Sequence, residues 1–269
     1  MNVAQAKVIN LLHSIYPNSK IGPAPNIAYV YPATSNPLDS IAANNANLIR
    51  NWIYIDCLVK GEYSQILLNW CKEKNYQIEI FDGDMEEMQS CKVDFIAFNY
   101  YSTMTAKVSV KNSEFKMGNQ QQAFNIEGLF QIIENPNLEK TQYGWEIDPV
   151  GFRMTSRALH ERYGLPIIIT ENGLGAKDIL TEDKKVHDQY RIDYLKKHIE
   201  QIPKIISDGI KLFGYNPWSA IDLVSTHEGI SKRYGFVYVN RGEKDLKDMK
   251  RYKKDSLYWY KEVIKNNGI

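Results

Sequence analysis

Two short and nearly continuous apolar runs constrain the fold most strongly. They are VDFIAFNYY at residues 93–101 and PIIIT at residues 166–170. Strands of this kind are buried on both faces, which is typical of a parallel sheet covered by helices. Segments with helical periodicity separate them, so helices and strands alternate along the chain. The sequence therefore predicts an α/β fold built on a parallel sheet.

The other expected elements follow from apolar periodicity, capping residues and turn signals. Asp148-Pro149 provides an N-cap followed by proline at the first helical position. KLFGYNPW at residues 211–218 predicts a further strand, a short apolar segment covers residues 20–22, and KRYGFVYVN at residues 232–240 predicts a hairpin. Helices are expected at residues 2–15, 38–59, 63–74, 148–163, 182–207 and 254–264.

The region from Ser102 to Gly144 is polar and rich in Asn and Gln, and we expect it to be a long excursion on the active face. The chain contains no internal repeat, low-complexity tract or interdomain linker. Residues 1–269 are therefore expected to form a single domain with about four core strands.

Composition excludes several classes of function. Thirty-three Lys and Arg balance 32 Asp and Glu, so no overall field favours nucleic acid or an acidic membrane. No secretory or membrane-spanning segment is expected, and three widely spaced cysteines favour a reducing, cytoplasmic location. The five histidines show no spacing typical of zinc ligands, so we expect no metal site.

Glu171 stands directly after PIIIT and before Asn172-Gly173, where a buried strand enters a turn. In an α/β barrel, the carboxyl ends of the strands form the catalytic face. A polar residue after a strand is also common as a turn or cap residue. The position alone leaves both interpretations open.

Five motifs occur in a fixed order along the chain: DFIAFNYYS, GWEIDPVGFR, ITENG, GYNPWSAID and KRYGFVYV. Together they resemble the landmarks of glycoside hydrolase family 1, which comprises β-glucosidases and 6-phospho-β-glucosidases. The resemblance implies the C-terminal half of a (β/α)8 TIM barrel, with strands five to eight. It also implies that Glu171 is the nucleophile of a retaining hydrolase that uses no cofactor.

The same resemblance implies a residue that this chain lacks. A retaining glycosidase needs a second carboxylate about 5–5.5 Å from the nucleophile, acting first as general acid and then as base. In the family this glutamate lies in an Asn-Glu-Pro motif on the fourth strand, and the chain contains no such motif. Glu134, in Glu134-Asn135-Pro136, has the same letters in another order and precedes GWEIDP, so it is rejected as the acid.

The resemblance assigns further contacts around Glu171. Tyr101 corresponds to a tyrosine that hydrogen-bonds the nucleophile and holds its orientation. Trp218 corresponds to a tryptophan that stacks under the sugar, and Asn99 is expected among the substrate-binding residues. For Tyr101 and Trp218, aromatic packing at the barrel rim is the alternative interpretation.

Three residues indicate a phosphorylated sugar. Family members that act on plain sugars carry a Glu seven positions after the residue matching Trp218, whereas this chain carries Ser225. A carboxylate would repel a phosphate dianion, but a hydroxyl can donate to it. The spacing from Ser225 to Lys232 and Tyr234 resembles the phosphate-binding signature of the 6-phospho branch. Lys232 and Tyr234 would share one face of an extended segment, although an ordinary aromatic strand face is the alternative.

The predicted substrate is a 6-phospho-β-glucoside, and the small Thr226 favours the gluco over the galacto configuration. Pro217 and His227-Glu228 depart from the family pattern beside this site. The alternatives are a β-glucosidase for unphosphorylated sugars and a non-catalytic module that binds a sugar phosphate. Because strands five and eight would present unpaired edges, we expect a complementary N-terminal half or self-association as partner.

Overall fold

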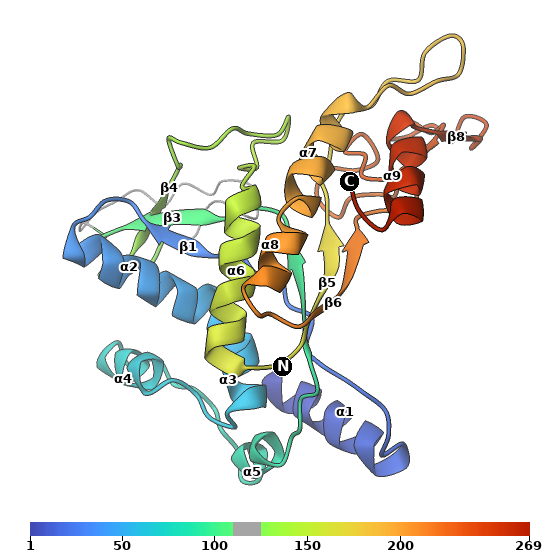
Figure 1. Ribbon diagram of the computed structural model, residues 1–269. Helices are drawn as coiled ribbons and strands as arrows, with labels where there is room; N and C mark the ends of the chain where they lie inside the picture. The colour runs from blue at the N-terminus through green and yellow to red at the C-terminus, as the bar shows by residue number, and fades with distance from the viewer. Residues whose placement is uncertain (110–124) are drawn as a thin grey trace.

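The structure is a computed structural model that describes residues 1–109 and 125–269. Its centre is a parallel sheet of β2 (Ile96–Tyr100), β5 (Ile167–Asn172) and β6 (Leu212–Pro217), in the order β2-β5-β6 (Figure 1). Residues 21–27 run along the free side of β2, where the amide of Ala97 donates to the carbonyl of Pro23 and that of Asn99 to Pro25, both at 3.0 Å. Four parallel segments therefore lie side by side, as the sequence predicts.

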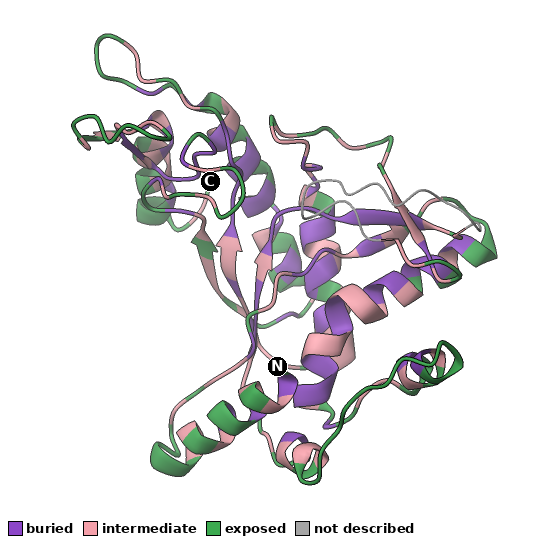
Figure 2. Ribbon diagram, turned by 180° about the vertical axis from the view of Figure 1, so that it is seen from behind, coloured by how far each residue is buried: buried purple, intermediate pink, exposed green. Residues whose placement is uncertain are grey.

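Helices cover one face of this sheet. In Figure 1, α6 (Pro149–Tyr163), α7 (Gln189–Ile199) and α8 (Ile202–Ser207) lie along one side of the strands, and the strands are also in view from behind (Figure 2). On β5, Ile167 and Ile169 are fully buried against the helices, whereas Ile168 is partly exposed. The expectation of burial on both faces is thus wrong for PIIIT, because helices pack on only one side of the sheet.

The remaining helices flank this centre. They are α1 (Asn2–Ile15), α2 (Pro37–Asn47), α3 (Ile53–Val59), α4 (Gln65–Glu73), α5 (Asp84–Gln89) and α9 (Asp255–Asn266). A π-helical turn, Leu48–Trp52, joins α2 to α3, so the predicted helix at residues 38–59 is confirmed with a change of winding inside it. No periodic signal indicated α5.

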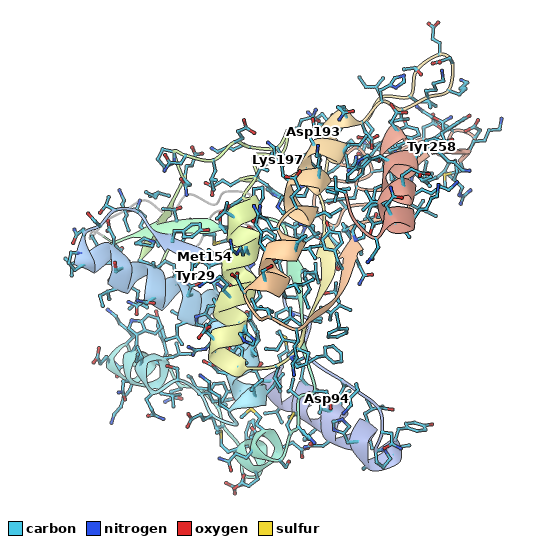
Figure 3. All side chains as sticks on the ribbon, viewed as in Figure 1. Tyr29, Asp94, Met154, Asp193, Lys197 and Tyr258 are labelled. Atoms are coloured by element: carbon cyan, nitrogen blue, oxygen red, sulfur yellow. The ribbon has the colours of Figure 1, made fainter. Side chains whose placement is uncertain are left out.

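Asp94, labelled in Figure 3, holds the start of β2. Its carboxylate accepts hydrogen bonds from His13 at 3.0 Å, from Lys20 at 2.8 Å and from the amide of Ile21 at 3.0 Å. Burial alone would raise the pKa of Asp94, but these donors outweigh it and bring the pKa to about 2. The carboxylate therefore ties α1 and the first strand segment to the sheet.

The predicted irregular excursion at residues 102–144 contains regular structure. β3 (Met104–Lys107) pairs in parallel with β1 (Val30–Pro32) and antiparallel with β4 (Gln131–Ile133), and α2 packs on this second sheet. Residues 110–124 of the excursion lie outside the described residues. The prediction missed these strands because their partners are distant in the sequence.

Two other predicted elements are wrong in extent. The helix expected at residues 182–207 begins only at Gln189, and it breaks between α7 and α8. In the expected hairpin, only β7 (Val237–Val239) forms a strand, and it pairs with β8 (Arg251–Lys253). Arg233 instead exchanges two backbone hydrogen bonds with Ala176, both of 2.9 Å, because the loop after β5 takes the position of the expected partner.

The cap predicted for α6 is confirmed. The carboxylate of Asp148 accepts from the amide of Gly151 at 2.7 Å and from the hydroxyl of Thr103 at 2.8 Å. Pro149 follows at the first helical position, and the helix ends at Gly164 with φ of 65°. Within the described ranges, every helix is too short or too polar to cross a membrane.

His198 makes the stability of this fold dependent on pH. It is fully buried on α7, stacks on Tyr194 with ring centroids 4.1 Å apart, and burial lowers its pKa to about 4. An unfolded chain binds this proton near pH 6.5, so stability should fall as the pH drops from about 6.5 towards 4. This residue should make the protein about 2 kcal/mol less stable at pH 5 than at pH 7.5.

Urea unfolding of the parent chain and of His198→Met at the two pH values tests this. The variant should lose that part of the pH dependence. An identical loss of stability in both proteins would contradict the prediction.

Candidate active site

Glu171 lies at the carboxyl end of β5, half-buried and in register with Asn99 on β2. Its carboxylate accepts a hydrogen bond from the hydroxyl of Tyr101, which follows β2. Burial raises the pKa of Tyr101, and its bond to Glu171 raises it further. Tyr101 therefore stays protonated and acts as a fixed donor to Glu171. The side chain of Asn99 accepts from Thr170 at 2.7 Å, one residue before Glu171.

Asn172 fixes the strand end next to Glu171. Its amide donates to the carbonyl of Tyr100 at 2.9 Å and to the hydroxyl of Tyr194 at 3.2 Å. Its side-chain oxygen accepts from Tyr215 at 2.7 Å, and its carbonyl accepts from the amide of Trp218 at 2.8 Å. Asn172 is fully buried and was missed as a site residue, although it belongs to the ITENG motif.

Trp218 directly follows β6 and packs on a cluster of buried aromatic residues at the sheet edge, formed by Tyr101, Trp145 and Tyr234. We call this group the rim cluster. Tyr101 contacts Trp145 with ring centroids 5.4 Å apart, and Trp145 lies 6.5 Å from Tyr234. The cluster brings together Tyr101, Trp218 and Tyr234, which are three of the predicted site residues, and it adds Trp145, which the sequence did not single out. A tryptophan in GWEIDP was the available signal.

Lys232 extends its ammonium group into this aromatic surface. The residue is 3% exposed, and Nζ lies 3.9 Å from the ring centroid of Trp145, 4.7 Å from Tyr143 and 5.9 Å from Tyr234. Burial lowers the pKa of Lys232, while Glu228 opposes the shift. Gly175 makes room for the stem of Lys232, since a Cβ there would lie 2.5 Å from it.

Ser225 lies in a turn that it closes with Gly229 through backbone hydrogen bonds of 3.0 and 3.2 Å. Its side chain lies close to Tyr234. Burial raises the pKa of Tyr234, and Ser225 partly offsets that rise. Thr226 is exposed and lies 2.8 Å from the ring nitrogen of His227. The three predicted phosphate residues, Ser225, Lys232 and Tyr234, are therefore neighbours.

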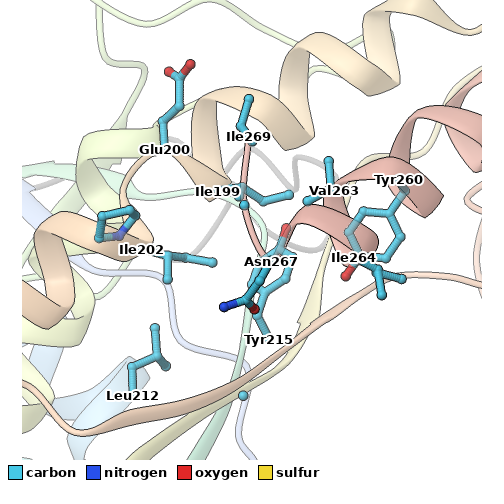
Figure 4. A pocket seen from close by; sticks show the side chains of 13 residues that line it. Ile199, Glu200, Ile202, Leu212, Tyr215, Tyr260, Val263, Ile264, Asn267 and Ile269 are labelled. Carbon is cyan, nitrogen blue, oxygen red and sulfur yellow. The ribbon is translucent and has the colours of Figure 1, made fainter.

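Glu134, the rejected acid, lies just after β4 with its side chain 75% exposed, and it pairs with Lys140 at 2.6 Å. The described residues also include a cavity of about 480 Å³ between α8, β6 and α9, lined mainly by aliphatic side chains such as Ile199, Leu212 and Val263 (Figure 4). None of the predicted site residues lines this cavity. The described residues contain no group of three or more His, Cys, Asp or Glu side chains suited to a metal ion.

Comparison with known proteins decides the family. The profile described as glycosyl hydrolase family 1 matches residues 1–269. The chain belongs to this family. It is 42% identical to an aryl-phospho-β-D-glucosidase of Bacillus subtilis, over 99% of this chain and 57% of the relative. A 6-phospho-β-glucosidase of Dickeya chrysanthemi is 36% identical, over 99% of this chain and 55% of the relative.

Solved structures give the same result for the fold. A family 1 β-glucosidase from Thermotoga maritima superposes with a TM-score of 0.84 at 35% identity, over 99% of this chain and 55% of that protein. The chain thus spans about half the length of the proteins it matches. The predicted half of a (β/α)8 barrel is confirmed.

The close contact between the two strand ends gives a direct test of this geometry. A Cβ at Gly173 would lie 2.1 Å from the carbonyl oxygen of Trp218, so Gly173→Ala must displace one strand end. We expect a loss of about 1–3 kcal/mol in unfolding free energy, as for other overpacked sites. Tryptophan fluorescence should change as well, because Trp218 moves.

Gly268→Ala is the matched control, because nothing lies within 4 Å of a Cβ at that position. Urea unfolding monitored by circular dichroism measures both variants. Equal stability of Gly173→Ala and the parent would contradict this description of the strand ends.

Proposed function

We propose that the chain carries the nucleophile and the phosphate-binding residues of a retaining 6-phospho-β-glucosidase. Glu171 attacks the anomeric carbon, and Tyr101 orients its carboxylate. Trp218 and Asn99 contact the sugar. Ser225, Lys232 and Tyr234 bind the 6-phosphate. The general acid and base of this reaction is not among the residues assigned here, and Glu134 does not serve as it.

The observation that carries the proposal is the environment of Lys232. Four Lys and Arg residues are buried within the described part of the chain: Arg191, Lys232, Arg233 and Lys254. The other three form salt bridges with buried aspartates, whereas Lys232 forms none among the described residues. A buried charge without a counter-charge is costly, and aromatic faces compensate only part of that cost. An anion beside Lys232 would supply the missing charge.

The rim cluster connects this cation to Glu171. Tyr101 bonds Glu171 and packs in the same cluster as Trp145, over which the ammonium of Lys232 lies. Tyr234, whose ring centroid lies 5.9 Å from Nζ of Lys232, and its neighbour Ser225 add two hydroxyl groups, and hydroxyl and ammonium donors together suit a phosphate dianion. The names of the relatives in Bacillus subtilis and Dickeya chrysanthemi agree with a phosphorylated β-glucoside as substrate.

Binding of glucose 6-phosphate and of glucose to the chain tests the phosphate assignment. Lys232→Met should lower the affinity for glucose 6-phosphate at least about tenfold and leave the affinity for glucose unchanged. A tenfold change in affinity corresponds to about 1.4 kcal/mol of binding free energy. Lys177→Met is the control, because Lys177 is exposed and lies 5.8 Å from the ring centroid of Tyr143. Titration calorimetry measures the affinities. An equal loss in both variants would indicate general charge attraction and contradict the assignment.

Catalysis is tested with a chromogenic aryl 6-phospho-β-glucoside. The chain should turn it over only weakly alone, because loss of a general acid and base typically costs about 10²–10⁴ in rate. A separately produced N-terminal part of the Bacillus subtilis relative should restore turnover. In that mixture Glu171→Gln should abolish turnover, whereas Glu134→Gln should leave turnover unchanged. Turnover by Glu171→Gln would refute the nucleophile assignment.

A further inference from the structure

Six buried charged side chains form one network behind the rim cluster. Three are cations and three are carboxylates, each with its side chain at most 6% exposed. They come from the loops after β5 and β6, from α7, from the segment before β7 and from the start of α9, whose ribbons meet in Figure 1. The six residues are Asp178, Asp188, Arg191, Asp222, Arg233 and Lys254. Because the charges balance within the network, no external ion is needed there.

Arg191 contacts both carboxylates and backbone carbonyls in this network. It lies in the first turn of α7, and its Nε donates to Asp188 at 2.9 Å, while Nη2 lies 3.0 Å from both oxygens of Asp178. These two carboxylates orient the guanidinium plane. The charges of Asp178 and Asp188 also outweigh the effect of burial and raise the pKa of Arg191, so it stays charged.

The same guanidinium donates to three backbone carbonyls on two separate segments. Nη1 donates to Leu174 at 2.8 Å and to Tyr234 at 3.2 Å, and Nη2 donates to Arg233 at 3.3 Å. Leu174 lies three residues after Glu171, and Arg233 stands between Lys232 and Tyr234. Arg191 therefore bridges the turn that leaves the nucleophile strand and the segment that carries the phosphate residues.

The bridged segment has other fixed points. Arg233 exchanges two backbone hydrogen bonds of 2.9 Å with Ala176, and the amide of Ser219 donates to the carbonyl of Tyr234 at 3.1 Å. Side-chain contacts from the network add to these backbone bonds. The amide of Gly235 donates to Asp222 at 2.9 Å, and the guanidinium of Arg233 donates to Asp222 at 2.9 Å. Lys254 bonds Asp222 at 2.7 Å and also bonds Asp178. Residues 232–236 belong to no strand, and these side-chain contacts set the position of the segment together with its backbone bonds to Ala176 and Ser219.

We propose that Arg191 is a positioning residue that fixes Lys232 and Tyr234 relative to Glu171. It touches no substrate and acts through the carbonyls of Leu174, Arg233 and Tyr234. This inference rests on the proposed function, because it concerns the spacing between the proposed nucleophile and the proposed phosphate site. The new element is that the preference for a phosphorylated sugar over a plain one depends on the buried guanidinium of Arg191, which lies outside the site.

The planar fork of arginine is essential to this role. Arg191 makes directed bonds to two carboxylates and three carbonyls at once, which the compact ammonium of lysine cannot reproduce. Lysine nevertheless keeps the positive charge between Asp178 and Asp188. Arg191→Lys should therefore fold but release the carbonyls. A neutral residue would remove the only cation that pairs with Asp188 among the described residues and strongly destabilise the chain.

The test measures binding of glucose 6-phosphate and glucose to the full chain by titration calorimetry, with folding monitored by circular dichroism. Arg191→Lys should bind glucose 6-phosphate about tenfold more weakly and glucose as before. Combined with Lys232→Met, it should cause little further loss, because both changes remove the same contribution. Arg162→Lys is the matched control, since Arg162 also forms a two-bond pair with a buried aspartate, Asp56, at 2.9 and 2.5 Å.

Each outcome decides the inference. A folded Arg191→Lys that binds glucose 6-phosphate like the parent overturns it and leaves the proposed function intact. Losses that add fully with Lys232→Met, or that affect glucose equally, indicate a purely structural role and overturn it too. A parent chain without preference for glucose 6-phosphate contradicts the proposed function and this inference together. If Arg191→Lys does not fold, Asp188→Asn, which removes one of the two carboxylates that orient the guanidinium of Arg191, should show the same loss of preference, and the absence of that loss overturns the inference.

Discussion

The side chain of Asn172 is the contact on which the geometry of the site depends. It joins the central strand β5 to β2 through Tyr100, to β6 through Tyr215 and to α7 through Tyr194. A buried amide uses its donors and acceptor fully only when all three partners stand at the correct distance. The strand ends are therefore fixed together directly beside Glu171, and the direction of that carboxylate follows from the same constraint.

Buried charged side chains have two different kinds of partner near this site. Behind the rim cluster, Arg191, Arg233 and Lys254 alternate with three aspartates, and the resulting network joins loops that have little regular pairing. Inside the rim cluster, Lys232 lies over aromatic rings and forms no salt bridge among the described residues. A network with paired charges is rigid, whereas a cation over aromatic faces remains free to meet an anion. We therefore assign the paired charges to support of the site, and Lys232 to contact with a ligand.

The sequence predicted features that are local and missed features that depend on distant residues. The parallel strands and the Asp148 cap follow from apolar runs and capping chemistry, whereas the pairing of Tyr101 with Glu171 came only from the family resemblance. Trp145 and Lys232 are 87 positions apart, and no periodicity in either segment indicates that they touch. The network around Arg191 is hidden for the same reason, because each member alone resembles an ordinary surface charge. The start of α7 was misjudged for the same reason. Asp188 precedes the helix, and its carboxylate accepts hydrogen bonds from the amide and the hydroxyl of Ser256.

The arrangement also bears on how a barrel divides its chemistry. Retaining hydrolysis needs two carboxylates about 5–5.5 Å apart, with the general acid placed by different strands from those that hold the nucleophile. Here the proposed nucleophile and the proposed phosphate site lie in one continuous stretch, from β5 to the segment before β7, and share Arg191 as a common support. Recognition of the phosphate and placement of the attacking oxygen are thereby linked within one structural unit. A phosphate held by Lys232 would fix the sugar ring relative to Glu171 before any acid acts, so binding energy from a remote group is converted into orientation at the reacting carbon.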